Sequence, residues 1–175
     1  MEKAYETCVE MITQRGYHII DQDDERILAE RKNIFTKKDE QICVFLTNTS
    51  KFNVESIQEY ISMMKKMDVW HCIIVYRDNA TPVAKKIVEE SQELTIELFN
   101  EDELQFNITK HFLVPKHELQ YKKGTKDCQE FKKKYTDRIP IILKSDPIAR
   151  FYGYDKGDII KVTRRNGFVT YRICK

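Results

Sequence analysis

Residues 23–32 contain the side chains of this sequence that most resemble a hydrolytic metal site. Asp23, Asp24, Glu30 and Lys32 include a Glu-x-Lys element of the kind that binds a metal ion in some nucleases built on an α/β core. The acidic pair, however, lies shortly before Glu30 in a stretch that predicts loop and helix instead of two adjacent strands. A metal-dependent nuclease therefore stays an alternative, and we expect no catalytic residue, no metal and no cofactor.

A second group of residues could bind phosphate without cleaving any bond. Thr81-Pro82 follows a predicted strand and opens a predicted helix, where backbone N–H groups and the helix dipole point outward. Arg77, Lys85 and Lys86 add positive charge nearby. Thr81 could instead simply cap its helix. If the group does bind DNA, contacts of this type reach the backbone and carry no sequence preference.

Turn signals define the elements of the last third of the chain. Asp146-Pro147 predicts a helix start, because an Asp side chain accepts from an orphan backbone N–H and proline at the first helical position gives up no hydrogen bond. Gly153 ends this helix as a left-handed cap. Gly157 belongs to the turn that precedes Ile159.

Asn166-Gly167 predicts a β-hairpin with a two-residue type I′ turn, since both central positions of that turn need positive φ. Such a turn places Val162 opposite Tyr171 and Ile160 opposite Ile173 on a core-facing side. The other side is expected to be solvated and carries Lys161, Thr163, Arg165, Thr170 and Arg172.

Residues 1–113 alternate predicted strands with predicted helices. Strands are expected at Tyr17 to Ile20, Gln41 to Leu46, Trp70 to Tyr76 and Thr95 to Phe99. Helices are expected over residues 2–15, from Asn53 to Met67 and from Thr81, with shorter ones at Ile27 to Arg31 and Glu101 to Phe106. This alternation is typical of crossover helices between parallel strands, so we expect an α/β domain with a mainly parallel sheet. The sequence has no Gly-x-Gly-x-x-Gly or Walker loop, which argues against nucleotide binding.

The charge is divided unevenly along the 175 residues, although the net charge is only +2. Residues 115–175 hold 16 Lys and Arg against 7 Asp and Glu, whereas residues 1–114 hold 14 against 21. A basic segment of this kind raises the possibility of nucleic-acid binding. The lysines between positions 122 and 134, however, have no interleaved aromatic residues and are typical of a solvated face or a protein-docking rim.

The cysteines do not suggest a metal site or a disulfide framework. The 5 cysteines are widely spaced and form no Cys-x-x-Cys pair, so we expect buried free thiols.

No apolar run approaches the roughly 18 residues of a membrane span, and no signal-peptide core is seen at the N-terminus. We therefore expect an intracellular protein that does not contact a membrane.

Four sequence blocks, in order, resemble one known family. They are Val114-Pro-Lys-His117, Ser145-Asp-Pro-Ile-Ala-Arg150, the Gly-x-x-x-Gly of Gly153 and Gly157, and Thr170-Tyr-Arg-Ile-Cys174. They resemble the C-terminal assembly domain of the fifth, shared subunit of eukaryotic-type nuclear RNA polymerases, a family with an archaeal counterpart. The likeness continues more thinly through Asn79-Ala-Thr-Pro-Val-Ala-Lys85. The chain departs from the family at Val83, where serine is more common, and at its shorter hairpin tip.

The resemblance implies a non-catalytic subunit of a multisubunit DNA-directed RNA polymerase. Residues 1–113 would form an α/β jaw-type domain near downstream duplex DNA, with contacts from Arg77, Thr81, Pro82, Lys85 and Lys86. Residues 114–175 would form a small α+β assembly domain that ends in a β-hairpin and docks on the largest subunit of the polymerase core. The implied interface residues are Pro115, His117, Pro140, Asp146, Pro147, Arg150, Gly157, Tyr171 and Arg172.

Several alternatives stay open at this point. Asp146, Arg150 and Arg172 could brace the small domain by ion pairs instead of contacting a partner. Ile141, Leu143, Phe151, Tyr154 and Phe168 are expected to be available to a partner, because about sixty residues bury little core alone. A free-standing DNA-binding adaptor is a further alternative to the polymerase subunit. We expect a nuclear location if the source is cellular, and a virion or cytoplasmic factory if it is a large DNA virus.

Overall fold

The structure is a computed structural model that describes residues 1–33, 39–49, 51–91, 93–135 and 138–175. The chain divides into two compact units, unit 1 (residues 1–106) and unit 2 (residues 107–175). The domain boundary expected after residue 113 stays a prediction. Among the described residues, no helix combines the length and the apolar character needed to cross a membrane.

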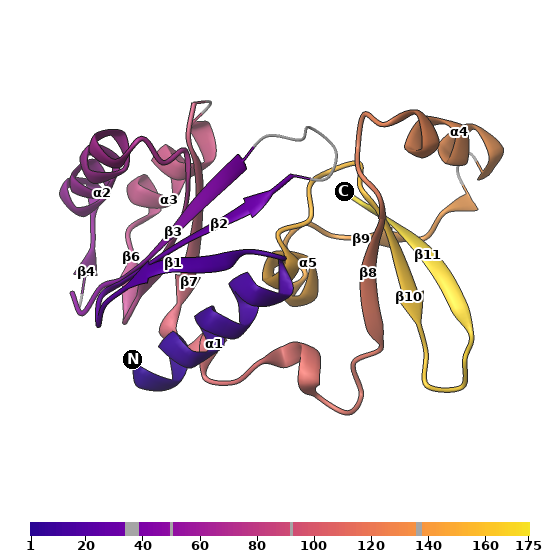
Figure 1. Cartoon of the computed structure of the whole chain (residues 1–175), viewed down its shortest axis with the longest axis horizontal. Helices are drawn as coiled ribbons and strands as arrows, with labels where there is room; N and C mark the ends of the chain where they lie inside the picture. Colours follow the sequence, from indigo (N-terminus) through magenta and orange to yellow (C-terminus); the bar gives the residue numbers. More distant parts are fainter. Residues whose placement is uncertain (34–38, 50, 92, 136–137) are drawn as a thin grey trace. The chain divides into compact units, whose positions relative to one another are not determined.

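Unit 1 is built on a five-stranded sheet with the strand order β1-β2-β3-β5-β7 (Figure 1). These strands are β1 (His18–Gln22), β2 (Arg26–Lys32), β3 (Asp39–Leu46), β5 (His71–Tyr76) and β7 (Thr95–Asn100). The pairs β3–β5 and β5–β7 are parallel, but β1–β2 and β2–β3 are antiparallel. The expected mainly parallel sheet is therefore wrong, and the sheet is mixed. Residues 23–25 alone separate β1 from β2, and so short a connection allows only antiparallel pairing.

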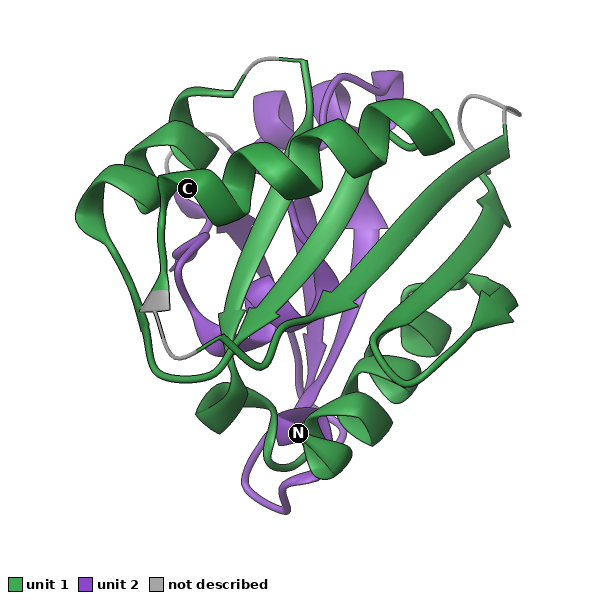
Figure 2. Cartoon of the chain, turned by 90° about the vertical axis from the view of Figure 1, so that its left-hand side faces the viewer, with its two compact units in different colours: residues 1–106 green, residues 107–175 purple. Residues whose placement is uncertain are grey.

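Helices cover both faces of this sheet (Figure 2). On one face, α2 (Val54–Met67) and α3 (Pro82–Glu90) pack on a buried cluster that includes Phe45 and Ile74. Side chains alternate along a strand, so Ile73 points to the other face. There α1 (Glu2–Gln14) contributes its own buried stripe, which consists of Ala4, Thr7, Cys8, Met11 and Ile12. Two covered faces explain why β3 and β5 are nearly continuous apolar runs.

Strand β2 corrects the expectation of a short helix over Ile27 to Arg31. The segment pairs along its whole length with β3, from Arg26 opposite Phe45 to Lys32 opposite Asp39. Ile27 and Ala29 are fully buried while Glu30 is exposed, which is the alternation of a strand. The composition of the segment favours a helix locally, and pairing with a buried neighbour overrides that weak preference.

Side-chain caps begin the later elements of unit 1 as expected. Asn53 caps α2 by accepting from the Ser56 N–H at 3.0 Å, and Thr81 caps α3 by accepting from the Ala84 N–H at 3.3 Å. Asn100 forms a capping box with Glu103 at the 3-10 helix η1 (Glu101–Leu104). Two short strands, β4 (Lys51–Phe52) and β6 (Asn79–Ala80), pair in parallel next to the α2 and α3 starts.

Unit 2 contains a four-stranded sheet with the order β8-β10-β11-β9. Its elements are η2 (Ile108–Lys110), β8 (Lys116–Tyr121), α4 (Lys126–Tyr135), β9 (Ile141–Ile142), α5 (Pro147–Tyr152), β10 (Ile159–Thr163) and β11 (Val169–Cys174). Helix α5 confirms the predicted signals at both ends. Asp146 Oδ1 accepts from the Ile148 N–H at 2.9 Å, Pro147 takes the first turn, and Gly153 ends the helix at φ 66°.

The β10–β11 hairpin is confirmed, but its predicted register is wrong by one residue. Val162 lies opposite Thr170 and Ile160 opposite Arg172, while Tyr171 pairs with Lys161. The Gly167 N–H donates to Arg164 O at 2.9 Å and the Arg164 N–H donates to Phe168 O at 2.9 Å. The loop therefore has three residues, a type I turn followed by Gly167 at φ 79°, instead of the expected two.

Both faces of the unit 2 sheet are covered, so the expectation of one wet face is also wrong. On one face, Ile160, Val162 and Cys174 are buried with Ala149 of α5. On the other face, Phe131 of α4 contacts Tyr171, with ring centroids 5.1 Å apart. The one-residue shift puts Thr170 and Arg172 on the side of the sheet that α5 covers, and Tyr171 on the side that α4 covers.

The small core of unit 2 uses two of the residues that were expected to face a partner. Phe151 and Tyr154 are buried, whereas Ile141, Leu143 and Phe168 are exposed. Helix α5 must turn its Phe151 side inward, because a unit of this size has few other large side chains to bury.

A buried carboxylate fixes the turn between α5 and β10. Asp158 is fully buried, and its oxygens accept from the Lys123 N–H at 2.8 Å, the Asp155 N–H at 2.8 Å and Lys122 Nζ at 3.1 Å. Lys132 Nζ of α4 donates to the carbonyl of Gly157 at 2.6 Å. The residues before α4 are therefore tied to the start of β10.

Candidate functional site

The first candidate site is the junction between β6 and α3. The Thr81 N–H donates to Phe52 O at 3.0 Å, and its hydroxyl oxygen is used as the cap of α3. Pro82 takes the first turn of the helix, and Val83 beside it is exposed. The capping role of Thr81, one of the two alternatives, is thus present in the structure. Pro82 has no N–H, and the N–H groups of Ala84 and Lys85 donate to Thr81, so the Val83 N–H is the backbone donor of this helix start that an anion could use.

Arg77 lies beside this junction but already has a partner. Its Nε donates to Glu101 Oε2 at 3.2 Å, and Glu101 also contacts the ammonium group of Met1. The pKa of the Glu101 carboxyl is lowered, first by the hydrogen bond from that ammonium group. Asn100 holds the same turn by donating to the carbonyls of Arg77 and Asp78, at 3.1 and 3.0 Å. The Arg77 side chain is half exposed, so it can still reach an external phosphate.

The two lysines of α3 differ in their contacts. Lys86 Nζ lies 3.6 Å from Glu90 one turn later, in a fully exposed pair of the kind that contributes little to stability. Lys85 is exposed, and no ion pair to another described residue is seen for it. Arg77 thus follows the end of β5, and Thr81, Pro82, Lys85 and Lys86 lie at the start of α3, while their role in DNA binding stays a prediction.

The acidic residues considered for a nuclease are not brought together. Asp23 and Asp24 lie in the turn after Gln22, which pairs with Ile27, whereas Glu30 lies opposite His18 at the other end of the same strand pair. Asp23 instead accepts from the Glu25 N–H and pairs with Arg26. The described residues contain no group of three or more His, Cys, Asp and Glu side chains suited to a metal ion. This geometry gives no support to the nuclease alternative.

The second candidate site is the face of unit 2 next to the start of α5. His117 on β8, Arg172 on β11 and Asp146 before α5 lie close enough to influence one another electrostatically. Burial lowers the pKa of His117 and the Arg172 charge lowers it further, while a hydrogen bond to the Pro115 carbonyl and the Asp146 charge act in the opposite direction. The His117 Nδ1 to Pro115 O distance is 2.8 Å, so Nδ1 carries the proton and a neutral His117 leaves Nε2 as an acceptor.

Helix α5 adds two more of the implied interface residues to this face. Pro147 is exposed at its first turn, and Arg150 is half-buried in its last turn. We name the set Pro115, His117, Asp146, Pro147, Arg150 and Arg172 the α5 face. These residues come from β8, α5 and β11 and from the segments just before them, so the sheet is what assembles them.

Three implied interface residues lie elsewhere in unit 2. Tyr171 packs against Phe131 on the α4 side of the sheet, and Gly157 contacts α4 through Lys132 and Cys128. The Pro140 carbonyl accepts from the Ile173 N–H at 2.8 Å next to β9. The contacts seen for these three residues are therefore contacts within unit 2.

The structure reveals one feature that sequence reasoning missed and another that it identified only through Phe168. One is a buried ionic centre in unit 1, where Arg15 makes two hydrogen bonds to Glu97 at 2.7 and 2.8 Å and His71 Nε2 lies 2.7 Å from the same carboxylate. The other is a group of exposed side chains at the hairpin tip and in the loop before β8. The first could not be found because its members are far apart in the sequence, whereas apolar residues next to turn residues were a usable signal for the second.

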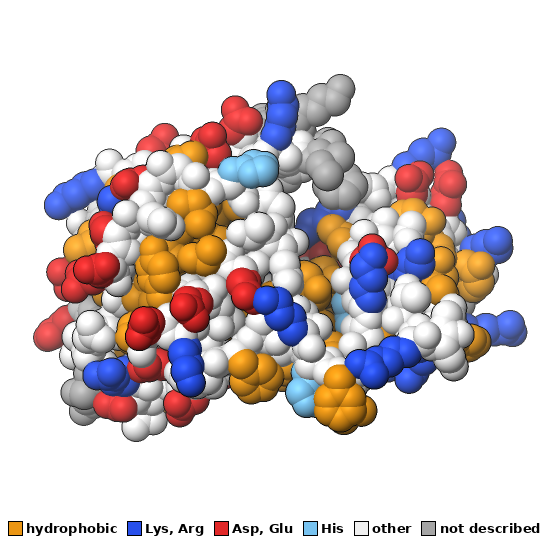
Figure 3. All heavy atoms as spheres, turned by 60° about the horizontal axis from the view of Figure 1, so that its bottom comes forward, with side chains coloured by type: hydrophobic (Ala, Val, Ile, Leu, Met, Phe, Trp, Pro, Cys, Tyr) orange, Lys and Arg blue, Asp and Glu red, His pale blue; other side chains and the backbone are white. Residues whose placement is uncertain are grey.

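Charge also separates the two units. On the face seen in Figure 3, Asp and Glu side chains gather over unit 1 and Lys and Arg side chains over unit 2.

The 5 cysteines are all buried, which confirms the expectation of buried thiols. Burial raises the pKa of Cys8 and of Cys43 to about 12, so neither forms a reactive thiolate near neutral pH.

Comparisons with known proteins support the resemblance along the chain. The family described as RNA polymerase Rpb5, C-terminal domain, matches residues 106–174. The chain is 36% identical over 184 residues to the DNA-directed RNA polymerases I, II, and III subunit rpabc1 of Dictyostelium discoideum, covering 96% of this chain and 93% of that protein. It is 34% identical over 188 residues to the putative DNA-directed RNA polymerase subunit 454R of Invertebrate iridescent virus 6, covering 99% and 98%.

Proposed function

The chain belongs to the Rpb5 family of DNA-directed RNA polymerase subunits, and from this premise we propose that unit 2 docks it on the polymerase core while unit 1 approaches downstream DNA. The subunit acts in transcription. It is not catalytic by itself in this proposal, since the acidic residues considered for hydrolysis are separated, with Asp23 and Asp24 in the turn before β2 and Glu30 toward the far end of that strand.

The observation that carries the docking proposal is the α5 face. It combines two arginines, an N-cap carboxylate and a half-buried histidine on one side of a unit whose own core is small. Arginine is enriched at protein interfaces, because its planar group pairs with carboxylates and also packs on apolar atoms. We propose the largest subunit of the polymerase as the partner of this face.

Co-purification tests this proposal. A tagged full-length chain is expressed in cells that contain the polymerase, and the recovery of the two largest subunits is measured. We expect both to be recovered with the wild-type chain and to decrease with Arg172→Ala, while the melting temperature of the free variant stays within a few degrees of wild type. A wild-type chain that recovers neither large subunit refutes the proposal.

The DNA proposal rests on the cations around the start of α3. Lys85 is exposed and has no ion pair to a described residue, Arg77 is half exposed, and the start of α3 lies between these two residues in the sequence. Contacts of this kind are made to phosphates and are the same for every sequence. Unit 1 is acidic as a whole, so we expect weak DNA binding by the free subunit and a measurable effect in the assembled enzyme.

The salt dependence of DNA retention tests this second part. We expect the triple variant Arg77→Ala, Lys85→Ala, Lys86→Ala to weaken retention of downstream DNA by the assembled polymerase, and more so at low salt. The slope of log affinity against log salt should fall by about 0.9 for each phosphate that is no longer neutralised. The double variant Lys65→Ala, Lys66→Ala on α2 is the control and should keep the wild-type slope. An unchanged slope in the triple variant removes these residues from the DNA site.

The relatives come from two kinds of source, a cellular organism and a large DNA virus. We propose a nuclear location if the source is cellular, and a virion or cytoplasmic factory if it is viral. Fluorescence imaging of the tagged chain together with the largest subunit distinguishes these locations.

A further inference from the structure

The arginines of the β10–β11 hairpin differ from those of unit 1 in their partners. All the arginines of unit 1 form ion pairs with carboxylates, and they are Arg15, Arg26, Arg31 and Arg77. Arg164 and Arg165 at the hairpin tip form no ion pair with any residue that the structure describes. The sequence explains the difference, because residues 107–117 and 159–175, which form the hairpin and the segment beside it, contain neither Asp nor Glu.

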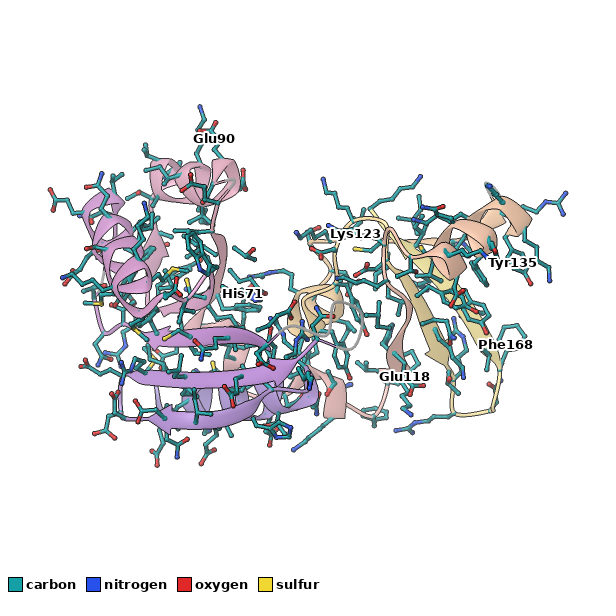
Figure 4. All side chains as sticks on the ribbon, turned by 45° about the horizontal axis from the view of Figure 1, so that its top comes forward. His71, Glu90, Glu118, Lys123, Tyr135 and Phe168 are labelled. Carbon is teal, nitrogen blue, oxygen red and sulfur yellow. The ribbon has the colours of Figure 1, made fainter. Side chains whose placement is uncertain are left out.

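One aromatic ring contacts one of these arginines, and two more large apolar residues lie next to that ring in the chain or across the hairpin from Arg164. The Arg165 guanidinium lies 5.7 Å from the ring centroid of Phe112, and the Arg164 N–H donates to the Phe168 carbonyl across the hairpin. Phe112, Leu113 and Phe168 are 61%, 73% and 60% exposed. The Phe168 side chain points outward from the side of the hairpin (Figure 4). We name Phe112, Leu113, Arg164, Arg165 and Phe168 the tip surface.

The fold of unit 2 does not depend on the side chains of the tip surface. The turn is held by backbone hydrogen bonds, by Asn166 Oδ1 accepting from the Phe168 N–H at 3.1 Å, and by Gly167 at positive φ. Three large exposed apolar residues in one small region are unusual for a surface that faces only water. They are explained if something else covers them.

The composition of the tip surface indicates a protein partner. Arginine and aromatic residues are enriched at protein interfaces and lysine is depleted, and the tip surface has the first two and no lysine. The exposed end of α4 differs, because its cations are lysines, Lys133 and Lys134, beside the single aromatic residue Tyr135. Leu113 offers nothing to a phosphate, and the ring of Phe112 already contacts His111, with centroids 4.9 Å apart, so a nucleic-acid base would have to compete for it.

We propose that the tip surface is a second docking site, separate from the α5 face, for an acidic segment of another subunit of the same polymerase. Carboxylates of that segment pair with Arg164 and Arg165, which have no carboxylate partner among the described residues, and its apolar side chains cover Phe112, Leu113 and Phe168. Guanidinium–carboxylate pairs of this kind are strong when apolar contacts exclude water around them. The proposal rests on the proposed function, because it takes the partner from the polymerase.

Charge reversal tests the tip surface in the full-length chain. The tagged double variant Arg164→Glu, Arg165→Glu is compared with wild type for recovery of the polymerase subunits, and Phe168→Ser tests the apolar part. The matched control is Lys133→Glu, Lys134→Glu, which changes the charge of unit 2 by the same amount. We expect recovery to fall at least about tenfold for the arginine variant, several-fold for Phe168→Ser and less than about twofold for the control. The melting temperatures of all free variants should match wild type.

Wild-type recovery of the polymerase by both tip variants would overturn the inference without touching the proposed function. If, in that case, the free arginine variant also loses binding to a fluorescent single-stranded 20-nucleotide DNA, the tip surface is assigned to nucleic acid instead. Failure of the wild-type chain itself to recover any polymerase subunit would instead refute the proposed function, and this inference with it.

Discussion

The charged side chains of units 1 and 2 are used in different ways. In unit 1 the arginines pair with carboxylates of the same unit, and the most buried, Arg15, has a side chain only 2% exposed. In unit 2 the strongest internal ion pairs use lysine, at Asp155 and Asp158, and the hairpin arginines at the tip have no described carboxylate partner. The difference indicates that the ionic groups of unit 1 mainly stabilise its fold, whereas Arg164 and Arg165 of unit 2 keep their charges exposed.

The largest expected effect is the loss of the buried ionic centre of unit 1. Glu97→Ala leaves the Arg15 guanidinium buried without its carboxylate, so we expect the free energy of unfolding to fall by about 4 kcal/mol. Chemical denaturation of the full-length chain measures this. Glu93→Ala, at an exposed position of the same region, is the control and should change stability by less than about 0.5 kcal/mol.

The same centre predicts a dependence on pH. Burial would raise the pKa of Glu97, but Arg15 and then His71 favour the carboxylate and hold its pKa well below the ordinary value of 4.5. A carboxyl group whose pKa is lower in the folded state contributes stability that is present above about pH 4.5 and is lost as pH falls below it. We expect this loss to disappear in Glu97→Gln. An acid dependence identical to wild type in that variant would contradict the role of Glu97.

Removing the buried carboxylate of unit 2 is expected to lower the free energy of unfolding somewhat less than Glu97→Ala does in unit 1. Asp158→Ala removes the acceptor of two backbone N–H groups, although Lys122 keeps its contact with Asp155 at 2.8 Å. We expect a loss of about 3 kcal/mol, and faster hydrogen exchange of the β10 and β11 amides than in wild type. Asp127→Ala at the exposed start of α4 is the control. If exchange increases equally in unit 1 and unit 2, the carboxylate does not act within unit 2 as described.

Removing the aromatic side chain that joins the unit 2 sheet to α4 should lower the free energy of unfolding less than Asp158→Ala does. Tyr171 is half-buried against Phe131, so we expect Tyr171→Ala to lose about 2 kcal/mol, below the ~3 to 5 kcal/mol of a fully buried aromatic residue. Tyr171→Phe keeps the ring and serves as the control. Because Tyr171 lies on the α4 side, polymerase recovery should follow the stability of each variant. Reduced recovery by a Tyr171→Phe variant of wild-type stability would place Tyr171 in the docking surface itself.

The smallest effects are expected at two helix caps that have the same chemistry in different units. Thr81→Ala and Asp146→Ala each remove one side-chain acceptor from a helix start, so each should cost about 1 kcal/mol. Thermal unfolding of the two variants measures this. Their effects on assembly should differ, because Asp146 belongs to the α5 face and Thr81 does not. Equal polymerase recovery by both variants would remove Asp146 from the docking surface.

Local signals in the sequence predicted the elements whose ends are fixed by single residues. Asn53, Thr81 and Asp146 were identified as helix starts because each cap is a contact within a few residues. Strand β2 was missed because its conformation depends on β3, and the segment considered alone favours a helix.

The hairpin shows how a small local error changes the predicted site. Asn166-Gly167 is compatible with both a two-residue and a three-residue loop, and the choice shifts every cross-strand pair by one. The prediction consequently placed Tyr171 beside Val162, and it separated Arg172 from Ile160. Once the register is known, His117 and Arg172 lie on the α5 face, which no spacing in the sequence could have shown.

The central claim is that unit 2 holds the chain on the polymerase and unit 1 does not. Two charge-matched variants of the full-length chain test it, Arg150→Glu with Arg172→Glu in unit 2 and Arg77→Glu with Lys85→Glu in unit 1. Recovery of the largest polymerase subunit is measured for both, beside the melting temperature of each free variant. We expect recovery to fall at least about tenfold for the unit 2 variant and to stay within about twofold of wild type for the unit 1 variant. Equal recovery by both, or loss only in the unit 1 variant, would contradict the account.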